Sequence, residues 1–162
     1  MSHDHVTPRA GESSPFHFDD RWSVDADIDT VWAVLERVDE WPQWWPGLAA
    51  VEPVGDKVRP GSRAQVVVRT PIGVPLRFTL EVEALTAPNL VVLRAHGDLR
   101  GEGVWTVSEH DGTTHVDSLW CVTSTRTMIR ILRPVASLMH AIVMRAGERG
   151  LAARLTDPRA HP

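Results

Sequence analysis

The 162-residue sequence has one cysteine, no tyrosine and no long apolar run. Cys121 alone cannot form an intrachain disulfide, and so little cysteine is typical of a reducing compartment. Charged residues or histidines interrupt every apolar stretch before the about 20 residues that a membrane-spanning helix needs. The segment Met1–His5 lacks the basic and apolar parts of a secretory signal peptide. We therefore expect a cytoplasmic protein with no membrane span.

A surplus of positive charge and a phosphate-binding loop are also absent from the sequence. The formal net charge is −4 at pH 7, whereas a general nucleic-acid-binding protein usually carries a basic surplus on one face. No glycine-rich loop of the Walker or Rossmann type is present. We therefore expect neither a nucleic-acid partner nor a cofactor. The 43% hydrophobic and 23% charged fractions are those of an ordinary globular domain.

Hydrophobic periodicity and turn residues predict the order of the first elements. Residues 1–14 are rich in small, polar and proline residues, which predicts a disordered N-terminal lead-in. A period of two over 16–24 predicts a half-buried strand, in which Asp20 is an exception on the apolar face. A helix capped by Asp27 or Asp29 follows. It must end before Trp41, because the residue before a proline avoids helical backbone angles.

The remaining chain reads as a run of strands and one long helix. Strands are expected over 48–54, 62–70, 76–83, 90–96, 102–109 and 115–124. After Thr125 the period changes to about 3.6 and continues to about Leu155, with a kink or a short leading turn at Pro134. One apolar arc of this helix is expected to cover the sheet: Met128, Ile131, Leu132, Val135, Leu138, Met139, Ile142, Val143 and Ala146.

Strands joined by hairpins form an antiparallel sheet, and a sheet with one apolar face must be covered. Only one long amphipathic helix is available to cover it. A strongly curved sheet around a single helix leaves a gap, which would form an apolar pocket. The same large side chains could instead fill a solid core, and the spacing alone leaves both arrangements open.

Several motifs extend over residues 16–155: Ser23–Ala26, Val31-Trp32, Trp41–Gly47, Gly61–Arg63, Gly97–Gly101, His140–Met144 and Gly147–Leu151. In these motifs the chain resembles the SRPBCC (START/Bet v1-like) superfamily, and more narrowly its polyketide cyclase/dehydrase family. The resemblance implies an α+β helix-grip fold, in which a seven-stranded antiparallel sheet wraps around a long C-terminal helix and encloses a hydrophobic ligand pocket. The domain would cover residues 15–156, followed by a flexible tail over 157–162. Asp27 departs from the proline that this family often has there.

Six apolar residues are candidates for the lining of the pocket. Four are aromatic and lie on the expected strands or the tryptophan-rich turn, and two lie on the long helix: Trp45, Phe78, Trp105, Trp120, Met139 and Val143. Aromatic and methionine side chains suit an adaptable apolar cavity. Their alternative role is to fill an ordinary core.

Four polar residues are candidates for chemistry in the pocket. His140 borders the apolar arc of the long helix and is the candidate general acid or base, since an imidazole transfers protons near neutral pH. Its alternative is a structural hydrogen bond between helix and sheet. Arg69, Arg94 and His96 could polarise a carbonyl group or could be solvated at strand surfaces. The sequence does not decide which alternate residues of 90–96 face the pocket.

No metal site and no cysteine nucleophile is expected. His110, Asp111, His115 and Asp117 surround one hairpin, but a hairpin tip is normally solvated and zinc needs three or four convergent ligands. Cys121 lies in the middle of a strand with no nearby helix N-terminus to activate it.

Three functions are consistent with these residues. In the first, the protein binds a small hydrophobic, polyketide-like or lipid-like molecule and catalyses its cyclisation or dehydration, with His140 moving protons. The second is a carrier or sensor with the same cavity and no chemistry. The third is a protein-interaction module that exposes Trp41–Trp45 as an anchor, because tryptophan is enriched at interaction hot spots. The sequence leaves the ligand and the oligomeric state open.

Overall fold

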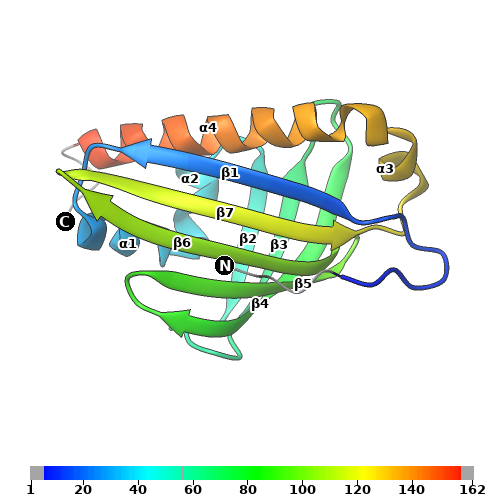
Figure 1. Cartoon of the computed structure of the whole chain (residues 1–162), viewed down its shortest axis with the longest axis horizontal. Helices are drawn as coiled ribbons and strands as arrows, with labels where there is room; N and C mark the ends of the chain where they lie inside the picture. The colour runs from blue at the N-terminus through cyan, green and yellow to red at the C-terminus, as the bar shows by residue number, and fades with distance from the viewer. Residues whose placement is uncertain (1–5, 56, 158–162) are drawn as a thin grey trace.

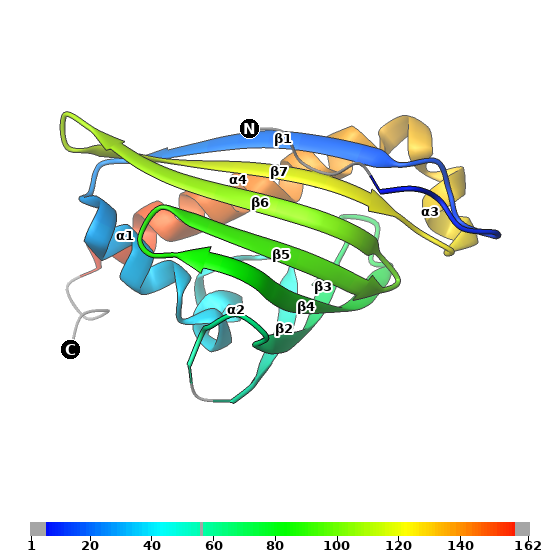
Figure 2. The same cartoon turned by 60° about the horizontal axis from the view of Figure 1, so that its bottom comes forward.

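Seven antiparallel strands form one sheet, in the spatial order β1-β7-β6-β5-β4-β3-β2. The computed structural model describes residues 6–55 and 57–157. The strands are β1 Phe16–Val24, β2 Leu48–Val54, β3 Arg63–Arg69, β4 Pro75–Thr86, β5 Leu90–Gly97, β6 Arg100–His110 and β7 Thr113–Thr123. The long helix α4, Ala136–Thr156, runs along the sheet roughly parallel to β1 (Figures 1 and 2). The expected seven-stranded sheet around a C-terminal helix is therefore confirmed.

Short helices connect the sheet to α4 and follow the predicted turn chemistry. The Asp27 side chain caps α1, Ile28–Leu35, by accepting a hydrogen bond of 2.7 Å from the Thr30 N–H. The turns η1, Val38–Glu40, and α2, Trp41–Trp44, follow. Pro134 lies in η2, Arg133–Val135, which separates α3, Thr127–Ile131, from α4. Among the described helices none is long and apolar enough to cross a membrane.

The rotation of α4 about its axis differs from the expected one. Met139 and Val143 face the sheet, but five members of the expected apolar arc are exposed to solvent: Met128, Ile131, Val135, Leu138 and Ile142. Met144, Gly147 and Leu151 are the buried residues of α4. The prediction that the whole arc covers the sheet is therefore wrong, because hydrophobicity alone does not determine which side of a helix can approach its neighbour most closely.

Two glycines of α4 allow it to approach α2 closely. A Cβ atom placed on Gly150 would lie 1.6 Å from the Trp44 carbonyl oxygen, and one on Gly147 would lie 2.5 Å from the Trp45 indole. The Trp45 Nε1–H donates a hydrogen bond of 2.8 Å to the Val143 carbonyl oxygen. Since no other residue type fits at these two positions, they fix the side of α4 that meets α2 and the sheet.

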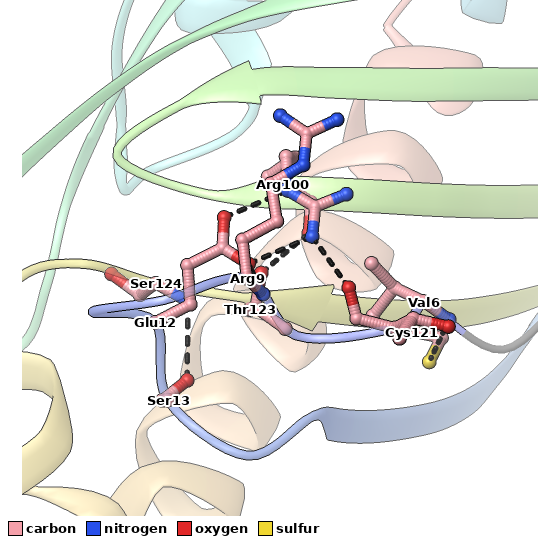
Figure 3. Close-up of polar contacts among 9 residues, drawn as sticks. Val6, Arg9, Glu12, Ser13, Arg100, Cys121, Thr123 and Ser124 are labelled. Atoms are coloured by element: carbon pink, nitrogen blue, oxygen red, sulfur yellow. Dashed lines mark hydrogen bonds and ion pairs between the residues drawn. The ribbon is translucent and has the colours of Figure 1, made fainter.

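The N-terminal segment 6–14 is held against β6 and the end of β7. The Arg100 guanidinium donates two hydrogen bonds of 2.7 Å to the Glu12 carboxylate (Figure 3). The Ser13 N–H donates to the Ser124 carbonyl oxygen at 2.9 Å, and the Ser124 N–H donates to the Ser13 hydroxyl at 3.1 Å. The segment therefore adds ordered chain beside the sheet.

This arrangement corrects the expected disordered lead-in over 1–14. Residues 6–14 are ordered by specific contacts: the Glu12 side chain is only 8% exposed, and it forms an ion pair with Arg100. The hydrogen bonds from Arg100 lower the pKa of Glu12 from 4.5 to about 2. The rest of the expected lead-in, residues 1–5, and most of the expected tail, residues 158–162, lie outside the described residues.

Replacing Gly150 tests the contact between α2 and α4. We expect Gly150→Ala to lower the free energy of unfolding by about 2–3 kcal/mol, because the new methyl group must push the helix away from the Trp44 carbonyl. Urea unfolding followed by tryptophan fluorescence measures the change. Ala153→Leu, a larger enlargement on the exposed side of the same helix, should change stability by less than about 0.5 kcal/mol. Equal effects would show that the close contact does not constrain the helix.

Replacing Glu12 tests the ion pair. At pH 7 we expect Glu12→Gln to lower the free energy of unfolding by about 2 kcal/mol. The folded-state pKa of Glu12 is depressed, so its contribution is complete above pH 4.5 and is lost as the pH falls toward about 2. The difference between wild type and variant should therefore be smaller at pH 3 than at pH 7. Glu52→Gln, at an exposed position, is the control, and a pH-independent difference would contradict the assignment.

Candidate functional site

An apolar cavity of about 190 Å³ lies between the sheet and the inward side of α3 and α4. It exceeds the roughly 150 Å³ of a cavity that holds benzene, although it is below the about 300–1,000 Å³ of typical drug-sized sites. Within residues 6–55 and 57–157, Thr70 and His140 are the lining residues with a polar side chain other than the tryptophans. The gap between sheet and helix is therefore a cavity and not a solid core.

A second, more polar space of about 380 Å³ adjoins the cavity and lies between η1 and the β2–β3 connection. The two spaces share four lining residues: Trp41, Val66, Leu80 and Leu93. Charged residues of both signs line the second space: Glu36, Asp39, Lys57 and Arg63. We name this second space the polar vestibule of the apolar cavity.

Tryptophans that line the cavity pack against further tryptophans of the core. The ring of Trp45 lies 5.0 Å from that of Trp22 and 6.1 Å from that of Trp105, measured between centroids. Trp44 and Trp45 are 6% and 4% exposed. The expectation that Trp41–Trp45 forms an exposed interaction anchor is therefore wrong, because these indoles pack into the core beneath α4.

His140 is the one ionisable side chain among the described residues that line the cavity. Its Nε2 lies 2.7 Å from the Asp20 Oδ2, and its ring stacks on Phe18 with centroids 3.9 Å apart. Because a carboxylate only accepts hydrogen bonds, the Nε2–H group of His140 is the donor in this hydrogen bond. In a neutral ring, Nδ1 is then the hydrogen-bond acceptor. Asp20 is the polar exception on β1 that the sequence shows, and its partner across the fold explains it.

The structure brings seven of the predicted site residues to the cavity: Trp45, Phe78, Trp105, Trp120, Met139, His140 and Val143. Trp45 directly follows α2, and three of the seven lie on α4. The other three, Phe78, Trp105 and Trp120, lie on the strands β4, β6 and β7. Their roles in binding or catalysis stay predictions. Sequence reasoning missed Asp20 as the partner of His140, and also missed Phe18. The alternation of β1 contains the signal for both.

Three predicted site residues do not line the cavity. On β5 the inward residues are Leu93 and Ala95, which are 8% and 1% exposed. Arg94 therefore lies on the outer face, where it pairs with Glu83, and His96 lies there too, 3.6 Å from a carboxylate of β4. Arg69 is exposed as well, since Val66 and Val68 take the inward positions of β3. Of the two alternatives for Arg69, Arg94 and His96, the structure shows solvated side chains on the strands, and none of the three lines the cavity.

Two of the four hairpin residues, His115 and Asp117, have partners on β1. Asp117 pairs with Arg21 at 2.7 Å, and the His115 Nδ1 lies 2.8 Å from the Ser23 hydroxyl. Within residues 6–55 and 57–157, no three His, Cys, Asp or Glu side chains gather as metal ligands would.

The curved antiparallel sheet, the long helix and the apolar cavity between them define a helix-grip protein. The family described as "Polyketide cyclase / dehydrase and lipid transport" matches residues 15–156, so the chain belongs to this family. The family resemblance seen in the sequence motifs is thereby confirmed. No curated protein matches the sequence.

Solved structures share the fold at low sequence identity. A Thermus thermophilus protein is 17% identical with a TM-score of 0.73, over 86% of this chain and 96% of that one. The Zhui aromatase/cyclase of a Streptomyces species is 16% identical with a TM-score of 0.71, over 90% and 98%. The di-domain ARO/CYC BexL is 17% identical with a TM-score of 0.70, over 88% of this chain and 50% of that one. At such identities the likeness shows the fold alone.

Proposed function

We propose that the protein binds a small, largely apolar organic molecule, about one or two rings in size, between the sheet and α4. The observation that carries this proposal is the cavity of about 190 Å³ whose lining is apolar except at Thr70 and His140. Moving apolar surface from water into such a cavity contributes roughly 25 cal/mol per Å². The polyketide cyclase/dehydrase and lipid transport family, and the structural similarity to an aromatase/cyclase, support this class of ligand.

The vestibule extends the range of ligands that the site accepts. A molecule too long for the cavity would extend past Trp41 toward Lys57, whose ammonium group can bind a carboxylate or carbonyl group at its polar end. The favoured ligand therefore has an apolar ring system or chain and one polar terminus.

Filling the cavity tests the binding function. Ala95 is 1% exposed and faces α4 from the middle of the sheet, so that we expect Ala95→Phe to occupy the space of the ligand. Binding of the neutral fluorescent probe N-phenyl-1-naphthylamine, measured by fluorescence titration, should weaken at least about tenfold, the equivalent of losing roughly 1.4 kcal/mol. Ala84→Phe, at an exposed position of β4, is the matched control. Equal affinities in both variants would refute binding in the cavity.

A second candidate function is acid–base catalysis in the same cavity, which the contact between His140 and Asp20 specifically favours. The Nδ1 atom of a neutral His140 would remove a proton from a carbon between two carbonyl groups of a poly-β-ketone. The resulting carbanion attacks another carbonyl carbon of the same chain, and the new alkoxide takes the proton back from the imidazolium. Loss of water then completes a dehydration. The shaped cavity holds the reacting carbons close together, which lowers the entropic barrier.

Replacing His140 separates catalysis from binding. We expect His140→Ala to lower the turnover of a poly-β-ketone, followed by the mass of the product, by at least about a hundredfold. Probe affinity should remain nearly unchanged, since the apolar lining is retained. His140→Gln keeps a hydrogen-bond donor toward Asp20 and checks that loss of activity is not loss of folding. His96→Ala, outside the cavity, is the control. Turnover that survives in His140→Ala would show that His140 is not the acid–base group. No turnover in the wild type, together with a ligand that co-purifies unmodified and is detected by native mass spectrometry, would favour a carrier instead.

A further inference from the structure

Exposed apolar residues form a continuous row on the outer side of α3, η2 and α4. The apolar stripe, as we name it, consists of Met128, Ile131, Val135, Leu138 and Ile142. Met128 and Ile131 lie on α3, Val135 ends η2, and Leu138 and Ile142 lie four residues apart on one side of α4. Ile131 and Leu138 are 67% and 63% exposed. Isolated exposed apolar residues are ordinary, whereas a contiguous row of large ones marks an interaction surface.

The segment that carries the apolar stripe has charged residues of one sign. From residue 118 to residue 147 the chain contains four arginines and no aspartate or glutamate, although the whole chain has a net charge of −4. Arg126 pairs with Asp98. Arg133 donates to two backbone carbonyl oxygens, of Ser14 and Pro15. Arg133, Arg130 and Arg145 form no ion pair with any described carboxylate. Arg130 and Arg145, which are both exposed, therefore leave positive charge on this segment that no described carboxylate balances.

The apolar stripe also lies beside the cavity. Ile129 of α3 and Ala136 at the start of α4 line the cavity from one side, and Thr70 and Pro71 of the β3–β4 connection line it from the other. Ile72, the next residue of that connection, is 54% exposed. Figures 1 and 2 both show the β3–β4 connection near the start of α4. Exposed apolar side chains therefore flank the place where the β3–β4 connection and the α3–α4 junction meet over the cavity.

We propose that the apolar stripe docks on the surface of an anionic lipid bilayer. Apolar side chains bordered by arginines are the pattern of a helix that lies in a membrane interface, and negatively charged lipid headgroups complement the arginines. A symmetric contact between two copies of the chain would instead bring these arginines toward their counterparts in the other copy, and like charges would repel. If the proposed function holds, the bilayer is also the apolar phase from which the cavity takes its ligand.

Vesicle co-sedimentation tests this docking. We expect the wild-type protein to sediment with vesicles of phosphatidylcholine mixed with phosphatidylglycerol, and to bind vesicles of phosphatidylcholine alone several-fold more weakly, with the difference suppressed by salt. Leu138→Glu should lower binding to the mixed vesicles at least about tenfold. Arg130→Glu should lower binding to the mixed vesicles several-fold and leave binding to phosphatidylcholine vesicles unchanged.

The matched control is Val54→Glu, which places the same charge at an apolar residue that is 66% exposed at the end of β2, outside the apolar stripe. It should bind vesicles as the wild type does. Docking is overturned if the wild type does not sediment with mixed vesicles, or if Val54→Glu and Leu138→Glu bind equally. It is also overturned if the wild type is a dimer that does not bind vesicles and that Leu138→Glu dissociates into monomers. Probe binding without vesicles, expected to be intact in Leu138→Glu, reports on the cavity separately, so that docking and the proposed function fail independently.

Discussion

The contact between α2 and α4 is the constraint on which the other features of this protein depend. Gly147 and Gly150 let the helix approach the Trp44-Trp45 backbone and rings at distances that a Cβ atom would not permit. The hydrogen bond from the Trp45 indole to the Val143 carbonyl oxygen adds a directional tie. A helix held at one end by steric contact cannot rotate to bury its most hydrophobic side, and its remaining length follows the direction set there.

That single rotation has two consequences on opposite sides of α4. On the inner side, Met139 and Val143 meet the curved sheet without filling the space, so that the cavity remains. On the outer side, Leu138 and Ile142 are left in solvent. The cavity and the apolar stripe are therefore products of the same packing, and their nearness is a property of the fold and not of two separate sequence features.

The polar chemistry of the cavity is similarly concentrated. His140 reaches the lining because it lies on the inward side of α4, and Asp20 of β1 holds its Nε2 at 2.7 Å. In surroundings of low polarity one hydrogen-bonded imidazole is a strong determinant of how a ligand is oriented, since few other groups can satisfy a buried carbonyl or hydroxyl. The same pair would supply directed proton transfer if the bound molecule carries an acidic carbon.

The sequence by itself determined the secondary structure, because local signals carry it: the alternation of β1, the Asp27 cap, the proline turn at η2 and the turn residues between strands. It also indicated the aromatic and helical part of the cavity lining, since period-two and helical patterns place such residues on shared faces. Only the tertiary structure decided that Leu93 and Ala95, and not Arg94 and His96, face inward, because strand parity has meaning only once pairing register is set. It also decided the rotation of α4, the partnership of His140 with Asp20 and the ordering of residues 6–14. Each of these depends on contacts between segments far apart in the chain, whose geometry no local pattern encodes.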